Sequence, residues 1–209
     1  MKKVVIYQVK EMLYDEVMKF VKSNAPKRFR YSNRFYKKAD RYNSAVAYVL
    51  LCIAYGFIIK EFEVGKHGKP YFKTFAQYLS ISHSGSIVTV GISDNEIAID
   101  CEYKQSVDEF IIEKTFTKKE KKLVEKQYMK ESAIWTAKEA ISKFWNEDWY
   151  SYPRTEITIE ENIIYDQNNP NLLLEFIDLE NCSICIVSED EDKSEVYWII
   201  ENDIKKMVE

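Results

Sequence analysis

Residues 78–102 read YLSISHSGSIVTVGISDNEIAIDCE, and this stretch decides the fold class. It contains three runs rich in apolar and β-branched residues, at 78–82, 87–93 and 97–102, which are typical of β-strands. Gly85 lies between the first two runs and Asp94-Asn95 between the last two, and both favour tight turns. We therefore predict three successive strands joined by short turns.

Helices are predicted on both sides of these strands. Within residues 40–55, apolar side chains recur at positions 46, 49, 50 and 53, which is the spacing of one helix face. Further along the chain, Thr117 and Glu120 form a capping-box pattern that predicts a helix running to about Met129. Another helix is predicted over 132–144.

Further strand patterns complete a two-part organisation. Residues 3–9 alternate weakly and predict an edge strand. Five short apolar runs in the last third of the chain predict strands at 155–160, 163–165, 172–178, 183–187 and 196–200. The order is helix and then strands, twice, which indicates the α+β class with two similar α/β halves. We expect the halves to span 1–102 and 103–209.

The composition is that of an ordinary globular protein. The chain has 209 residues, of which 46% are hydrophobic, and no apolar run approaches the roughly 20 residues that span a bilayer. Because the first residues lack the pattern of a secretory signal, we expect a cytoplasmic protein without a membrane partner. Cys182 and Cys185 have the spacing of a redox or zinc motif, but a strand would place them on opposite faces. We expect them to be structural.

The net charge of −4 hides an asymmetry along the chain. Residues 22–41 contain eight basic side chains and one acidic one, whereas residues 155–209 contain fifteen acidic and three basic ones. A basic segment attracts an anion, and an acidic half repels nucleic acid. This distribution favours a small phosphorylated ligand over DNA or RNA.

Three segments carry polar residues that are unusual for their predicted structure. Asp100 and Glu102 end an apolar strand and share one face of it, an arrangement that suits a hard cation such as Mg²⁺. Glu139 and Lys143 are one helical turn apart, so that Glu139 is a candidate third ligand or base and Lys143 a candidate phosphate contact. His83 precedes a glycine turn, where it can donate hydrogen bonds to an anion. Each segment alone is also compatible with an ordinary structural role.

Taken together, these segments resemble the 4′-phosphopantetheinyl transferases of the surfactin-synthetase-activating type. The matching stretches, in order, are Gly68-Lys69-Pro70, Ser82-His83-Ser84-Gly85, Ile99-Asp100-Cys101-Glu102 and the nine residues WTAKEAISK at 135–143. Phe116-Thr117 with Glu120 also fits. The resemblance covers roughly residues 28–200, nearly the whole chain.

The resemblance implies a pseudo-two-fold fold of two α/β halves with the site between them. It implies that Asp100, Glu102 and Glu139 hold Mg²⁺, and that His83 and Lys143 bind phosphate oxygens of coenzyme A. The serine of an apo acyl or peptidyl carrier protein would attack the β-phosphate and release 3′,5′-ADP, its proton passing to Glu139 or to a metal-bound water. The remaining nucleotide contacts would come from Lys69, Pro70, Ser82 and Arg28. A monomer and a role in secondary metabolism are further expectations from the family.

Some positions depart from the family pattern. An arginine is usual where this chain has Asn43, so that Arg28, Lys37 or Lys38 would have to contact the 3′-phosphate. Ala98 and Asn146 each stand near a usual glycine, and asparagine tolerates the left-handed conformation of helix ends. The missing arginine motivates an alternative, a catalytically inactive relative that binds coenzyme A or a carrier.

Two other expectations concern partners and rival chemistry. Five lysines lie on the predicted helix that follows Thr117, at 118, 119, 121, 122 and 126, with Lys114 and Lys130 on either side. An acidic carrier protein would be steered to such a face.

A metal-dependent phosphohydrolase is an alternative interpretation, but nothing in the sequence resembles a two-metal cluster and the chain has only two histidines.

Overall fold

The computed structural model describes most of the chain, namely residues 1–60, 62–65, 69–72, 76–146 and 154–209. These residues form two compact units, the first made of 1–94 and 194–209 and the second of 95–193. The sequence predicted a boundary at residue 102 instead of 94. The two differ because the strand at 97–103 pairs within the second unit.

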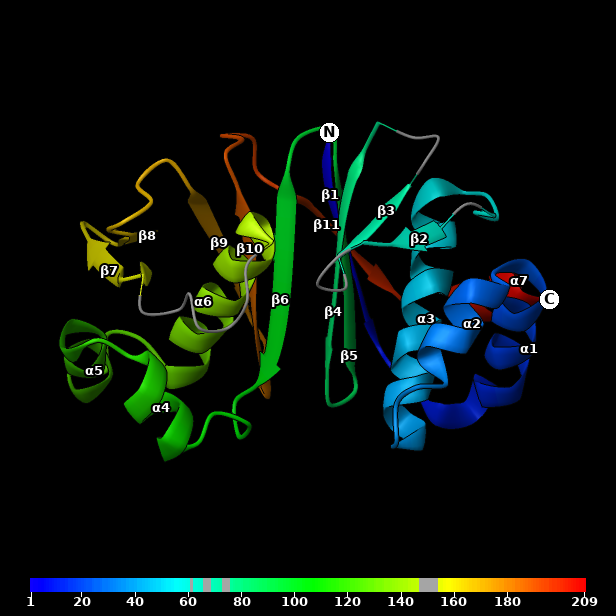
Figure 1. Ribbon diagram of the computed structural model, residues 1–209, viewed down its shortest axis with the longest axis horizontal. Coiled ribbons are helices and arrows are strands. Elements are labelled where there is room, and N and C mark those ends of the chain that lie inside the picture. The colour runs from blue at the N-terminus through cyan, green and yellow to red at the C-terminus, as the bar shows by residue number, and fades with distance from the viewer. Residues whose placement is uncertain (61, 66–68, 73–75, 147–153) are drawn as a thin grey trace. The chain divides into compact units, whose positions relative to one another are not determined.

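A four-stranded sheet forms the base of the first unit (Figure 1). In order across the sheet, its strands are β11 (Glu195–Ile199), β1 (Lys2–Gln8), β5 (Ile87–Ser93) and β4 (Tyr78–Ser84). The prediction of an edge strand at 3–9 is wrong, because β1 pairs in parallel with β11 and antiparallel with β5. The C-terminal segment thus returns to cover the open side of β1, and residues 4–7 are buried.

Helices cover one face of this sheet (Figure 1). After a short 3₁₀ turn at Glu11–Leu13 come α1 (Tyr14–Asn24), α2 (Pro26–Ser32) and α3 (Lys38–Tyr55), and α7 (Glu201–Val208) ends the chain. Every residue of α3 from 42 to 52 is buried, because α1, α2, α7 and the sheet all contact this helix. Gly56 ends α3 in the left-handed conformation with φ 74°. A small antiparallel hairpin of β2 (Phe62–Val64) and β3 (Pro70–Phe72) follows.

The second unit is built on a three-stranded antiparallel sheet. Its strands in order are β6 (Ile97–Tyr103), β10 (Cys182–Ser188) and β9 (Leu173–Asp178). The helices are α4 (Glu109–Thr115), α5 (Lys118–Glu125) and α6 (Glu131–Trp145), and α6 packs on β6 and β10. A hairpin of β7 (Ile157–Glu160) and β8 (Ile163–Asp166) completes the unit.

The described parts of the two units repeat one order of elements. From β1 to β5 and again from β6 to β10, the chain forms a strand, three α-helices, a two-stranded hairpin and an antiparallel strand pair. The first unit also contains β11 and α7. The last strand of each series, β5 or β10, pairs antiparallel with the first, β1 or β6. The third helix of each series, α3 or α6, packs on these two strands. The α+β class predicted from the sequence is therefore observed.

The sequence located the strands better than the helices. The strands predicted at 78–82, 87–93 and 97–102 are observed at nearly those bounds. Four helices, α1, α2, α4 and α7, were not predicted. The helix predicted to reach Met129 ends at Glu125, because Gln127 has a positive φ of 58° that no α-helix accommodates.

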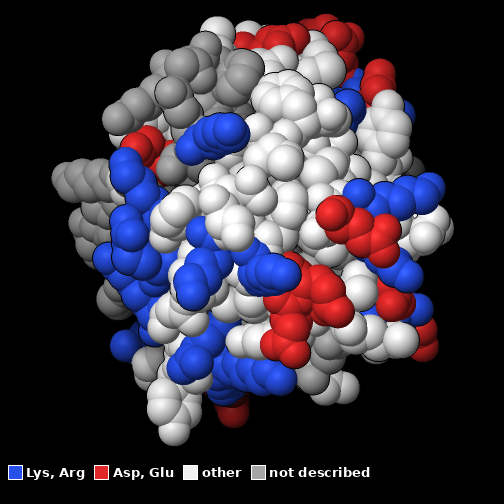
Figure 2. Space-filling view, turned by 90° about the vertical axis from the view of Figure 1, so that its right-hand side faces the viewer, with Lys and Arg blue, Asp and Glu red and all other residues white. Residues whose placement is uncertain are grey.

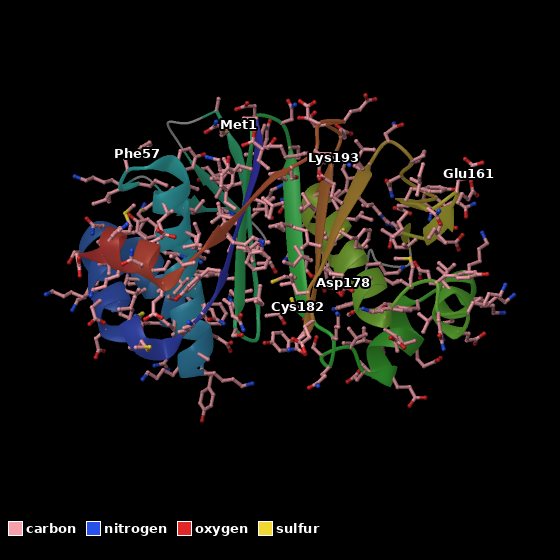
Figure 3. The ribbon with its side chains drawn as sticks, turned by 180° about the vertical axis from the view of Figure 1, so that it is seen from behind. Met1, Phe57, Glu161, Asp178, Cys182 and Lys193 are labelled. Atoms are coloured by element: carbon pink, nitrogen blue, oxygen red, sulfur yellow. The ribbon has the colours of Figure 1, made fainter. Side chains whose placement is uncertain are left out.

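The cysteine prediction agrees with the structure. Cys182 and Cys185 are free thiols, both buried, and an odd separation along β10 places them on opposite faces of the sheet. Figure 3 shows Cys182 where β10 begins, close to Asp178 at the end of β9.

Within the described ranges, no helix is long and apolar enough to cross a membrane.

The return of the C-terminal segment to the first unit can be tested at Ile204. This α7 side chain is fully buried against the core of the first unit. Ile204→Ala should lower the free energy of unfolding by about 2–5 kcal/mol, measured by urea denaturation with circular dichroism. Lys206→Ala, an exposed position in the same helix, should change it by less than about 0.5 kcal/mol. Equal effects of the two substitutions would contradict the packing.

Candidate functional site

The two carboxylates of β6 face α6. Ala98, Asp100 and Glu102 are two residues apart along the strand, so their side chains share one face. Ala98 packs in the cluster of apolar side chains formed with α6. The face on which the sequence placed the carboxylates is thus the face that α6 covers.

Lys143 of α6 binds Asp100 directly. Its Nζ lies 2.5 Å from Asp100 Oδ1, and the Asp100 side chain is only 3% exposed. Burial by itself would lower the pKa of Lys143, but the Asp100 carboxylate, helped by Glu139, raises it above its usual value. Two motifs that lie 43 residues apart in the sequence therefore meet in one charged pair.

Glu139 lies one turn before Lys143 on α6 and is partly exposed. It is close enough to Lys143 to raise the pKa of that ammonium. The predicted spacing of one helical turn between Glu139 and Lys143 is thus realised on α6.

Glu102 is held by the turn that follows β6. Ser106 Oγ lies 2.9 Å from Glu102 Oε2 and 2.6 Å from the carbonyl oxygen of Tyr103. The backbone N–H of Ser106 also donates to Tyr103, at 2.9 Å, which closes the turn. Lys104 fixes the same turn from the other side through an ion pair with Asp178.

The donor set of this region suits a hard divalent cation. Asp100, Glu102 and Glu139 offer carboxylate oxygens, the ligands that Mg²⁺ prefers. Among the residues that the structure describes, no three His, Cys, Asp or Glu side chains are grouped closely enough to hold a metal ion. Asp100 instead has the Lys143 ammonium as its close contact.

A buried ion pair next to Glu139 was missed by the sequence reasoning. Lys138 and Glu120 are both fully buried, and Lys138 Nζ lies 2.9 Å from Glu120 Oε1. Lys138 Nζ also donates to the backbone oxygen of Thr155 at 2.9 Å and to its Oγ1 at 3.2 Å. Burial lowers the pKa of Lys138 below its usual value, although Glu120 opposes this shift.

The predicted capping box contained the signal for this pair. Thr117 and Glu120 do cap α5, with Glu120 Oε2 accepting from the N–H of Thr117 at 2.7 Å. Its other oxygen, Oε1, accepts from the N–H of Ile157 at 2.8 Å as well as from Lys138. A cap residue that is completely buried needs such partners, but burial itself could not be read from the motif.

The other predicted site residues lie in the first unit. His83 stands near the end of β4, and its ring makes an edge contact with Phe35 at 5.8 Å between centroids. Ser82 is buried beside it. Lys69 and Pro70 lie at the start of β3, where the Lys69 carbonyl accepts from the N–H of Gly65 at 2.8 Å. Gly68 lies outside the described residues.

Arg28 has a packing role in the structure. It is 6% exposed, and its Nε and Nη2 donate to the carbonyl oxygen of Ser44 at 3.1 and 2.8 Å. Burial lowers the pKa of the Arg28 guanidinium to about 10. Asn43 is also buried and donates to the carbonyl oxygen of Gly85 at 2.8 Å. Both side chains thus fasten α3 to its neighbours.

Exposed cations remain on the first unit. Figure 2 shows basic side chains gathered over part of one of its faces. The exposed basic residues between 22 and 38 are Lys22, Lys27, Arg30, Arg34, Lys37 and Lys38. Lys27 is paired with Glu63, and Lys38 lies over the ring of Tyr14 at 4.3 Å.

Asn146 and Ala98, which stand near glycines in the family that the sequence resembles, both fit their positions in the structure. Asn146 caps the C-terminus of α6 in the left-handed conformation, with φ 53° and ψ 41°, as its residue type predicted. Ala98 is fully buried against α6 without loss of strand pairing.

No protein-family model and no curated protein matches the sequence.

The buried Lys138–Glu120 pair generates a stability prediction. Lys138→Met leaves a buried carboxylate without its cation and should lower the free energy of unfolding by about 3–5 kcal/mol. Lys119, on α5, makes an ion pair of similar length (2.6 Å) with Glu156 but is exposed. Lys119→Met should cost less than about 1 kcal/mol. Urea titration measures the free energy of unfolding of both variants. Similar losses in the two variants would show that the buried pair stabilises the fold no more than the exposed pair does.

Proposed function

We propose that this protein transfers the 4′-phosphopantetheine group of coenzyme A to a serine of an apo carrier protein, as a phosphopantetheinyl transferase of the surfactin-synthetase-activating type. The contact between Asp100 and Lys143 carries the proposal, because it joins two segments that the resemblance assigns to one site. The buried pair of Glu120 and Lys138 adds support, since both residues also belong to the matching segments.

The repeated order of elements supports the pseudo-two-fold fold that the resemblance implies. A strand, three helices, a hairpin and a strand pair occur twice among the described residues. Two topologically similar units in one chain are what such a fold requires. A chain that contains both halves should act as a monomer.

In the proposed reaction the carrier serine oxygen attacks the β-phosphorus of coenzyme A. The bond from phosphorus to the oxygen of 3′,5′-ADP breaks, and ADP leaves with the electron pair. Asp100, Glu102 and Glu139 are the residues that would hold Mg²⁺, which when bound supplies positive charge to the diphosphate. Lys143 supplies a second cation, which neutralises charge that builds up on the leaving group.

The other roles follow from the positions of the side chains. His83 can donate to a phosphate oxygen, because its ring lies near the end of β4 and is partly exposed. Lys69, Pro70 and Ser82 are the proposed nucleotide contacts beside it. Glu139 is the candidate base for the serine proton, because it lies one helical turn from Lys143.

A specific observation favours the alternative of an inactive relative. Asn43 and Arg28 are both buried in packing roles, so neither can be expected to reach a 3′-phosphate without moving. Lys37 and Lys38 are exposed and remain candidates for this contact. A protein that bound a carrier or coenzyme A without transfer would retain the fold and lose the reaction.

Lysines of α5 and of its C-cap form the proposed docking surface for the carrier. Lys118, Lys122 and Lys126 follow one face at a spacing of four residues and are exposed. None of the three forms an ion pair within the described ranges. Lys119 and Lys121 are neutralised within the protein, Lys119 by Glu156 and Lys121 by Glu113. Three uncompensated cations on one face favour an acidic carrier surface.

The transferase proposal is tested by intact-mass spectrometry. An apo carrier protein is incubated with this protein, coenzyme A and Mg²⁺, and a gain of one phosphopantetheine arm is expected. Asp100→Ala and removal of the metal with EDTA should each abolish the gain, because the diphosphate charge is then not neutralised. No gain across acyl and peptidyl carriers, with coenzyme A still bound, would instead establish the inactive relative.

The docking surface is tested by charge reversal. The triple variant Lys118→Glu, Lys122→Glu, Lys126→Glu should lower kcat/KM for an acidic carrier about tenfold or more at low salt, because steering is lost. A matched control reverses three exposed lysines of the first unit, Lys19, Lys205 and Lys206. The control should retain most of the activity and its salt dependence. Equal losses would show a general effect of net charge.

A further inference from the structure

Lys143 serves as the counter-ion of a buried carboxylate. The Asp100 side chain is 3% exposed, whereas that of Lys143 is 34% exposed, with Nζ 2.5 Å from Asp100 Oδ1. A carboxylate this deeply buried is costly unless a cation neutralises it, and the ammonium does so here. Glu139 adds a second negative charge close to the same ammonium. The position of Lys143 is therefore set by carboxylates that also belong to the proposed metal set.

A divalent cation on Asp100 would meet this ammonium at close range. Two cations within a few ångströms repel each other, and the repulsion is large where water is excluded. Because Asp100 is buried, solvent screens this repulsion poorly. The lysine has a flexible four-carbon stem and is one third exposed, so it can turn away while the strand-borne carboxylate stays in place.

We infer that Lys143 competes with the divalent cation for Asp100, so that metal binding moves the ammonium off the carboxylate and makes it available to phosphate oxygens. The inference rests on the proposed function for the identity of the metal ligands. It goes beyond that function by linking two steps, since occupation of Asp100 by metal and capture of the diphosphate by Lys143 become mutually favourable.

The competition predicts that removal of the Lys143 ammonium strengthens the binding of a divalent cation. Lys143→Met removes the competing cation, so affinity for a divalent cation in the absence of coenzyme A should rise, on the order of tenfold. The same variant should bind coenzyme A more weakly. A lysine that only contacts phosphate would leave metal affinity unchanged, and one that only supports the fold would weaken it.

The experiment measures Mn²⁺ binding to the full chain by electron paramagnetic resonance, without coenzyme A or carrier. Lys143→Met should bind Mn²⁺ more tightly than wild type, and Lys143→Arg, which keeps the charge, should resemble wild type. Lys130→Met is the matched control, because Lys130 also pairs with an aspartate of the second unit, Asp178, at 2.7 Å. It should leave Mn²⁺ affinity unchanged.

A double variant identifies the carboxylate. Adding Asp100→Asn to Lys143→Met should abolish the gain. The inference is overturned if Lys143→Met binds Mn²⁺ no more tightly than wild type, or if the gain persists without the Asp100 carboxylate. Thermal melting by circular dichroism verifies that each variant is folded, and Lys143→Gln replaces the methionine variant if that one unfolds.

These outcomes are separable from those of the transferase assay. A wild-type protein that modifies a carrier while Lys143→Met shows no tighter Mn²⁺ binding refutes the competition and leaves the proposed function intact. A wild-type protein that modifies no carrier while the variant gains Mn²⁺ affinity refutes the transferase and supports the competition.

Discussion

The second unit depends on a single buried carboxylate. Glu120 caps its own helix through the N–H of Thr117, accepts from the N–H of Ile157 on β7, and neutralises Lys138 on α6. Three elements that follow one another along the chain, α5, α6 and β7, therefore meet at one side chain. Because an unpaired charge in this position would be very costly, α5, α6 and β7 have little freedom to move independently.

This constraint extends to the candidate site. Lys138 fixes how α6 is rotated about its axis, and the next residue, Glu139, is thereby directed to a defined side. Lys143 follows one turn later and reaches Asp100 on β6. The charged pair at the site is thus supported by a second, more deeply buried pair in the same helix. The two lysines differ in exposure, because Lys138 is fully buried whereas Lys143 is one third exposed.

Several features were predictable because they depend on neighbouring residues. The strands around Gly85, the cap at Thr117 and the left-handed Asn146 are all properties of short segments. The helix α2 could also have been found, because Pro26 at its first turn is a recognised start signal.

Other features have no local signal. The parallel pairing of β1 with β11 joins residues about 190 positions apart, so the weak alternation at 3–9 suggested an edge strand. The helices α4 and α7 have only seven and eight residues, too few for intrinsic propensity alone to stabilise a helix, although Asp108 caps the start of α4. Their existence depends on contacts that are made only in the folded chain.

The sequence by itself determined the α+β class, the main strands, the helix carrying Glu139 and Lys143, and the shared face of Asp100 and Glu102. These follow from residue periodicity and turn chemistry, which act over a few residues. Only the tertiary structure decided that Lys143 binds Asp100, that Lys138 is buried on Glu120, and that Arg28 and Asn43 serve packing. The reason is that burial sets the partner of a charged side chain, and burial is a property of the whole fold.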